Sequence, residues 1–220
     1  MKHAAIRIRT DEPDYSAIPD QDFDWAYTVY GNVVEIVPED IPAPLDKFVT
    51  ITHYVDANLF HCMLMGRSVT GILDLVNQTP IDWYSKKQAT VETATYGSEF
   101  VAARTCVEQV MDLRLTLRYL GVPIRTRSFM FGDNKTVVES SIRPHAKLHK
   151  RHMALSFHRV REAIAAKIIA FYHIEGVLNP ADVLSKHWGY QQVRSLLLPL
   201  LFYRGDTIDI LDLTDVNISV

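Results

Sequence analysis

The chain has 220 residues, 48% of them hydrophobic and 22% charged, which is enough for one sizeable core or at most two small domains. Its formal net charge of -3 excludes a globally basic nucleic-acid-binding protein, so a nucleic-acid partner would need a local basic patch. The two cysteines, Cys62 and Cys106, indicate buried thiols in a reducing compartment. Without an apolar signal sequence or a membrane-length apolar run, we expect an intracellular protein with no membrane partner.

The two ends of the chain differ in composition from its middle. Residues 1–46 are rich in Pro, Asp and Glu and have no sustained hydrophobic period, which is typical of an extended lead-in or linker. Residues 201–220 form an acidic tail. Clear patterns lie between these segments, so the sequence predicts one folded domain over residues 47–200.

The domain opens with three expected strands. Residues 47–58, "KFVTITHYVDAN", are rich in β-branched and aromatic residues, and residues 68–77 and 81–88 follow with similar patterns. The connections are short, and Asn77 to Pro80 is a turn sequence. Three strands joined in this way predict an antiparallel meander.

Helices and strands then alternate. Apolar residues at helical spacing predict a long helix over 93–121, ending at Gly121. A strand is expected at residues 124–133, followed by a short helix or turn at 134–141. An amphipathic helix with a basic first half follows at 149–166, then a strand at 167–176 and a last helix at 179–201. Asn179 would cap the last helix. This order predicts an α/β fold: a mixed five-stranded sheet, with three antiparallel strands and then two parallel ones, flanked by helices.

Four acidic residues stand out by their places in this plan, in the first strand, in the long helix, at the end of the fourth strand and at the start of the last helix: Asp56, Glu99, Asp133 and Asp182. Each has an ordinary explanation alone. Gly-Asp-Asn at 132–134 is a common turn, Asp182 would interact with a helix dipole, and Glu99 would suit a solvated helix face. Those explanations do not account for all four positions together.

A shared metal site would account for them. If the first and fourth strands are neighbours, Asp56 and Asp133 lie side by side with the two helical acids facing them. Clustered carboxylates repel one another, and a divalent cation with hard oxygen ligands, such as Mg²⁺, removes that penalty. Two such ions would activate a water and stabilise the leaving oxygen of a phosphodiester.

Five motifs, in order, resemble the ribonuclease H domain of copia-type (pseudovirus) LTR-retrotransposon Pol polyproteins. They are "YVDAN", "GRSVTGILDLVNQTPIDWYSKKQATVETATYGSEFVAA", "FGDNKTVV", "HKRHMALSFHRVRE" and "NPADVLSK". The resemblance covers most of the chain, from about Phe48 to Trp188. It implies a ribonuclease H-like fold for residues 47–200.

The resemblance also implies a function. The family's catalytic metal ligands carry over onto Asp56, Glu99, Asp133 and Asp182, and the implied cofactor is a pair of Mg²⁺ ions, with Mn²⁺ as a substitute. The implied activity is endonucleolytic cleavage of the RNA strand of RNA–DNA hybrids during reverse transcription. The expected partners are the hybrid and an upstream reverse transcriptase domain of the same polyprotein. The expected location is the cytoplasm, in a virus-like particle for an intact element, or the nucleus.

Two departures qualify the resemblance. The loop "GVLNPAD" lacks the His that many cellular ribonucleases H place before the last Asp, and His173 nearby fits a structural strand residue better. Ala57 stands where a second Asp would give the polymerase motif "YVDD", so we expect no polymerase site in this chain. Residues 22–35 would then join a missing polymerase to this domain, and the chain would be the tail of a polyprotein or a truncated copy.

Basic residues suggest how the hybrid is held. Phosphate contacts set register and affinity without reading sequence, and we assign them to basic side chains around the expected site: Lys86, Lys87, Lys150 and Arg151. Asn134 and Lys135 would reach 2′-hydroxyls. A solvated face remains an alternative for the two lysines after the third strand.

Two other functions stay open. An inactive or domesticated remnant would keep the fold as a nucleic-acid-binding or structural module. An integrase-like nuclease would use two Asp and then a Glu on a late helix, whereas Glu99 lies on the first long helix.

Overall fold

A computed structural model describes residues 4–45, 47–62, 64–125, 127–148 and 150–203. The central five strands are β2 (Ile51–Cys62), β3 (Arg67–Val76), β4 (Thr79–Lys87), β5 (Ser128–Gly132) and β6 (Ile169–His173). The longer helices are α1 (Thr95–Tyr119), α2 (Lys135–Ile142), α3 (Ala154–Ala165) and α5 (Tyr190–Leu197), and α4 (Asp182–Ser185) is a single turn. Two 3₁₀ turns, η1 (Arg151–Met153) and η2 (Gly176–Leu178), and a small pair of strands, β1 (Ala4–Ile6) and β7 (Leu201–Tyr203), complete the described elements.

The main sheet has the order β4-β3-β2-β5-β6. The pairs β4–β3 and β3–β2 are antiparallel, and β2–β5 and β5–β6 are parallel. The expected fold class is therefore confirmed, with the meander first and two parallel strands beside it. Because β2 and β5 are parallel and pair from Thr52↔Phe129 to Val55↔Gly132, β5 ends beside the middle of β2, which continues to Cys62.

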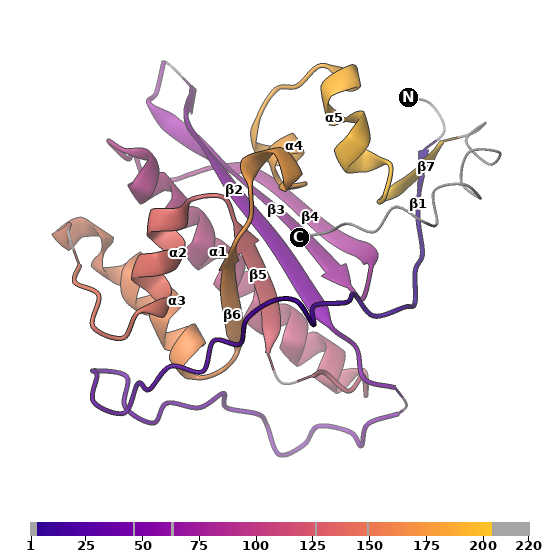
Figure 1. Cartoon of the computed structure of the whole chain (residues 1–220), viewed down its shortest axis with the longest axis vertical. Coiled ribbons are helices and arrows are strands. Elements are labelled where there is room, and N and C mark those ends of the chain that lie inside the picture. Colours follow the sequence, from indigo (N-terminus) through magenta and orange to yellow (C-terminus); the bar gives the residue numbers. More distant parts are fainter. Residues whose placement is uncertain (1–3, 46, 63, 126, 149, 204–220) are drawn as a thin grey trace.

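One face of the sheet packs against α1 and α3 to form the core (Figure 1). Side chains that alternate along β2 and β3, such as Val55, Ala57 and Ile72, join Phe100 and Val107 of α1 in this core. Alternation on a pleated strand sends the residues between them to the opposite face. Asp56 and Gly71 thus lie on the face that α4 covers.

The predicted lead-in is extended and lies along the domain, as the indigo and violet trace in Figure 1 shows. The ring of Tyr15 lies 4.5 Å from that of Phe129 on the second face of the sheet. The Gln21 side chain exchanges hydrogen bonds with the backbone of Phe171, at 2.6 and 3.0 Å, and Trp25 is buried in the core. The lead-in therefore supplies part of the domain's packing, while the predicted boundary at residue 46 remains a prediction.

Several elements differ in extent from the sequence prediction; the amphipathic helix expected from residue 149 begins at Ala154, after η1, and the strand expected from residue 124 begins at Ser128. The first strand continues past Asn58 to Cys62, because it forms a hairpin with β3 whose register shifts in that stretch. The predicted last helix is two helices, since extended backbone at Lys186 and Gly189 separates α4 from α5. The side chain of Lys186 pairs with the Asp182 carboxylate, and the indole of Trp188 donates to the Asp182 carbonyl. These contacts accompany the end of α4 after one turn.

The ends of the chain are only partly described. Residues 201–203 of the predicted acidic tail form β7, which pairs antiparallel with β1. The rest of that tail, 204–220, lies outside the described residues. Within the described residues, none of the helices combines the length and apolarity that a membrane crossing requires.

Candidate metal centre

The carboxyl end of β5 lies beside the middle of β2 and brings two predicted acids together. Val55 of β2 pairs with Gly132 of β5. Asp56 and Asp133 are the next residues after this pair, so they lie side by side. Asp56 is 1% exposed, whereas Asp133 is half-buried at the point where the chain leaves the sheet. Phe131 and Gly132, the last two residues of β5 before Asp133, are buried.

Glu99 reaches the same place from α1. It lies in the second turn of the helix and is 6% exposed. Carboxylate oxygens of Asp56, Glu99 and Asp133 all lie within 4.8 Å of one another. In the described part of the chain, these are the residues whose ligand atoms lie close enough together to hold a metal ion.

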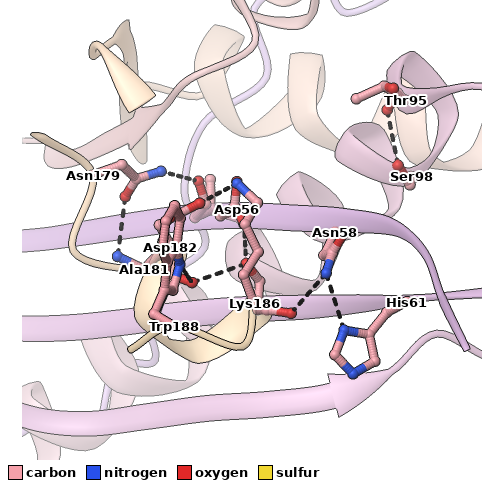
Figure 2. A network of polar contacts seen from close by, with 12 residues as sticks. Asp56, Asn58, His61, Thr95, Ser98, Asn179, Ala181, Asp182, Lys186 and Trp188 are labelled. Carbon is pink, nitrogen blue, oxygen red and sulfur yellow. Dashed lines mark hydrogen bonds and ion pairs between the residues drawn. The ribbon is translucent and has the colours of Figure 1, made fainter. Parts of the chain in front are cut away.

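The fourth predicted acid, Asp182, lies just outside this cluster. Its carboxylate pairs with Lys186 one turn later, and the Lys186 Nζ lies 3.5 Å from Oδ1 of Asp56 (Figure 2). Lys186 thus lies between the two carboxylates. The structure brings three of the four predicted ligands into one group and connects the fourth through a cation.

Burial and mutual repulsion raise the pKa values of the clustered acids. Burial raises the pKa of Asp56 to about 6, with contributions from the charges of Asp133 and Asp182, although Ser185 and Lys186 act in the other direction. Burial also raises the pKa of Glu99 well above its ordinary value, together with the charges of Asp56 and Asp133. Adjacent buried carboxylates with raised pKa values favour the binding of a cation that they share as ligands.

Lys186 is the cation that the structure itself supplies. Burial acts to lower its pKa, but the hydrogen bond to Asp182 and the charges of Asp56, Asp182 and Asp133 outweigh burial and raise it. Its ammonium therefore offsets part of the negative charge around Asp56.

The donor set fits a hard divalent ion. Oδ1 of Asp56 is buried and has no hydrogen-bond partner, while Oδ2 is bonded to the Ser185 hydroxyl. An unpartnered buried oxygen is costly, and coordination to a metal would satisfy it. Asp56 also lines a surface cavity, together with Ala57, Asn58, Leu59, Thr95, Glu99, Asp133, Asn134, Lys135 and Lys186. Oxygen ligands beside a solvent-accessible cavity are typical of Mg²⁺ sites.

The loop before α4 fixes the backbone around Asp56. Asn179 is fully buried, and its amide donates to the carbonyl of Val55 at 3.0 Å while its oxygen accepts from the N–H of Ala181 (Figure 2). The prediction that Asn179 caps the helix is wrong, because the N-cap of α4 is Ala181; Asn179 instead ties the loop before α4 to the strand that carries Asp56.

The predicted nucleic-acid contacts divide into two groups. Asn134 and Lys135 line the cavity beside the acids. Lys86 and Lys87 are exposed at the end of the edge strand β4, and Lys150 and Arg151 lie at the start of η1, all outside the cavity lining.

One of these side chains already has a structural role. The Oδ1 of Asn134 accepts from the N–H of Val137 at 3.2 Å and so caps α2. Its amide nitrogen, a donor that capping does not use, remains available to contact a substrate.

Sequence analysis did not single out Lys186 or Ser185 as site residues. The available signal was their spacing, because Lys186 follows Asp182 by four residues and shares its helix face. His173 was expected to be structural, and its Nε2 lies 3.1 Å from the backbone carbonyl oxygen of Asp133. That contact agrees with a structural role without testing it.

Sequence comparison adds a relative to this geometry. The chain is 26% identical, over 133 residues, to the "Retrovirus-related Pol polyprotein from transposon TNT 1-94" of Nicotiana tabacum. The predicted resemblance to a retrotransposon Pol polyprotein is confirmed. The matched part is 60% of this chain but only 10% of that Pol polyprotein. No protein-family profile matches the chain.

Solved structures similar to the chain are described as ribonuclease H proteins. The N-terminal RNase H domain of a Mycobacterium tuberculosis protein, fused to maltose-binding protein, matches with a TM-score of 0.49 and 13% identity, over 68% of this chain and 97% of that one. RNase H1 of Halobacterium salinarum NRC-1 matches with a TM-score of 0.48 and 12% identity, over 62% and 94%. LC11-RNase H1 in complex with RNA/DNA hybrid gives 0.47 and 15%, over 61% and 93%.

Proposed function

We propose that the chain is a ribonuclease H that cleaves the RNA strand of RNA–DNA hybrids during reverse transcription of a copia-type retrotransposon. The observation that carries the proposal is the meeting of Asp56, Glu99 and Asp133, whose carboxylate oxygens lie within 4.8 Å of one another and include a buried Asp56 carboxylate whose Oδ1 accepts no hydrogen bond. The similarity to a Pol polyprotein supports the retrotransposon context. The proposed cofactor is a pair of Mg²⁺ ions, for which Mn²⁺ would substitute.

The chain's own residues would hold and orient these ions. Asp56, Glu99 and Asp133 offer oxygens to a shared ion, and Asp182 offers a further carboxylate on the far side of Lys186. Bound divalent ions at such a site activate a water and stabilise the leaving oxygen of a phosphodiester. The hydrogen bonds of Asn179 and Ser185 hold the backbone and carboxylate of Asp56 in place, which keeps the ligand geometry preorganised.

Basic side chains around the cavity would hold the hybrid. Lys135 is exposed at the cavity wall and would meet a backbone phosphate close to the scissile bond. The Asn134 amide nitrogen would contact a 2′-hydroxyl, the group that distinguishes RNA from DNA. We assign non-specific phosphate contacts at a greater distance to the exposed Lys86, Lys87 and Arg151 and to the half-buried Lys150.

The order of the acids separates this proposal from an integrase-like nuclease. The glutamate of the cluster comes from α1, between the two aspartates in sequence, rather than from a late helix. In an intact element the proposed partner is an upstream reverse transcriptase, and the proposed location is the cytoplasm or the nucleus.

A cleavage assay with a matched variant tests the proposal. The purified chain is incubated with an RNA–DNA hybrid labelled on the RNA strand, in Mg²⁺, beside Asp133→Asn, which keeps the size of the side chain but removes its charge. We expect cleavage products with the native chain and a loss of at least about a hundredfold with Asp133→Asn, as when a metal site is impaired. Hybrid binding without cleavage in either Mg²⁺ or Mn²⁺ would instead support the inactive remnant.

A further inference from the structure

Lys186 occupies the space between two of the carboxylates in the candidate metal centre. Its Nζ pairs with Asp182 and lies 3.5 Å from the buried Oδ1 of Asp56. That oxygen accepts no hydrogen bond, so the ammonium holds it by a long ion pair alone. A carboxylate oxygen of Asp56 also belongs to the cluster with Glu99 and Asp133.

The position of Lys186 is set by the short helix that precedes it. Asp182 and Lys186 are one helical turn apart, so their side chains meet. Ser185, the residue before Lys186, bonds to Oδ2 of Asp56, and the indole of Trp188 donates to the carbonyl of Asp182 at 3.3 Å. These contacts hold the base of the Lys186 side chain beside Asp56, while the four-carbon stem remains able to rotate.

From this geometry we propose that Lys186 competes with a divalent ion for Asp56 and Asp182. The first ion binds at Asp56, Glu99 and Asp133, the group whose carboxylate oxygens lie within 4.8 Å of one another. The second binds only after the ammonium has left the space between Asp56 and Asp182. This inference rests on the proposed metal-dependent function and adds an order of binding to it.

Charge and exposure both support such an exchange. A lysine ammonium and a divalent ion neutralise the same carboxylates, so the two cannot share the space between Asp56 and Asp182. The Lys186 side chain is 33% exposed, compared with 1% for Asp56 and 7% for Asp182, and it lines the open cavity. The ammonium therefore has a route to solvent. There it could form an ion pair with a phosphate of a bound hybrid.

Metal binding tests the competition directly. Bound Mn²⁺ is counted by electron paramagnetic resonance and titrated calorimetrically in the native chain and in Lys186→Met, which removes the charge and keeps a long apolar side chain. We expect the second ion to bind about tenfold more tightly to Lys186→Met, equivalent to about 1.4 kcal/mol. The control is Lys135→Met, which removes an exposed charge from the same cavity and should change this affinity far less.

A measurement on the native chain covers the case in which the variant fails to fold. Lysines are acetylated at low reagent concentration and read by mass spectrometry, with and without Mn²⁺. Acetylation of Lys186 should rise at the Mn²⁺ concentration that loads the second ion, while the exposed Lys87 on β4 should react equally in both states.

The outcomes separate this inference from the proposed function. An unchanged or weaker second-ion affinity in Lys186→Met, or a Lys186 acetylation rate that ignores Mn²⁺, would overturn the competition and leave the metal centre standing. If the native chain and Asp133→Asn bind Mn²⁺ with the same affinity, the proposed metal centre is refuted, and the competition is refuted with it.

Discussion

Gly71 of β3 and Ala181, the residue before α4, lie in direct contact. A Cβ on Gly71 would be 2.6 Å from the carbonyl oxygen of Ala181 and 3.0 Å from the N–H nitrogen of Ser185. Gly71 also pairs with Asp56 across the β2–β3 ladder. A glycine in the middle of a strand therefore allows the turn that carries Asp182 and Lys186 to approach Asp56.

Gly71→Ala should displace α4. Overpacking against backbone costs about 2 to 3 kcal/mol, and the added methyl group would move Asp182 and Ser185 away from Asp56. We expect lower stability in urea denaturation and a loss of hybrid cleavage larger than the loss of folded protein. Gly189→Ala is the matched control, because its Cβ would meet only the Gln192 side chain at 3.4 Å. Full activity of Gly71→Ala would show that the position of α4 does not matter.

Glu99→Gln should stabilise the metal-free protein at neutral pH. The folded pKa of Glu99 is raised, so its ionised form costs stability as pH rises through that pKa, and the cost is absent below the ordinary value. We expect thermal melting in a chelator at pH 7.5 to rise by about 2–4 °C, or roughly 1 kcal/mol for a chain of this size. The two proteins should converge in acid, and the variant should lose the stabilisation that Mg²⁺ gives. A variant that melts lower in chelator would contradict the buried-charge argument.

Glu35→Gln should weaken the packing of the lead-in in a pH-dependent way. Burial acts to raise the pKa of Glu35, but hydrogen bonds from Arg114 and Arg118 outweigh it and lower the pKa to about 2. Stability from this group is therefore present above its ordinary pKa of 4.5 and disappears as pH falls towards 2.

The expected loss on Glu35→Gln is on the order of 2 kcal/mol at pH 7, and it should shrink as pH falls from about 4.5 to 2. Denaturant unfolding across that pH range measures it. The exposed Glu39, in the same segment, provides a Gln substitution without these arginine contacts as the control. A pH-independent difference between Glu35→Gln and the native chain would exclude the ion pairs as its cause.

Asn134→Ser separates capping from substrate contact. Serine keeps an oxygen that can accept from the Val137 N–H, whereas the amide donor is lost. We expect unchanged stability and Mn²⁺ binding but slower cleavage of the hybrid, by about five- to tenfold for one lost hydrogen bond. Asn134→Ala should lose the cap as well, at a cost of about 1 kcal/mol. Equal cleavage by Asn134→Ser and the native chain would remove Asn134 from the proposed hybrid contacts.

Local sequence determined most of the main sheet. The β-branched runs of β2 and β3, the turn at Asn77 and the apolar spacing of α1 each express a strong local preference, and the structure has an element at every such place. The four acids stood out by their positions in the predicted order of elements, and three of them interrupt apolar segments, which is visible without a structure. Element ends were less certain, as β2 and the last helix show, because cross-strand pairing and side-chain contacts decide them.

Contacts between distant residues decided the rest. The sequence could not show that Lys186 lies between Asp182 and Asp56, since one of those pairs is local and the other spans 130 residues. Nor could it show that the lead-in packs Trp25 into the core, because an isolated tryptophan in a Pro- and Asp-rich segment has no periodic signal. Residue type and spacing report the local preferences of a chain, whereas the side-chain partners of Asp56 depend on how its strands and α4 come together in space.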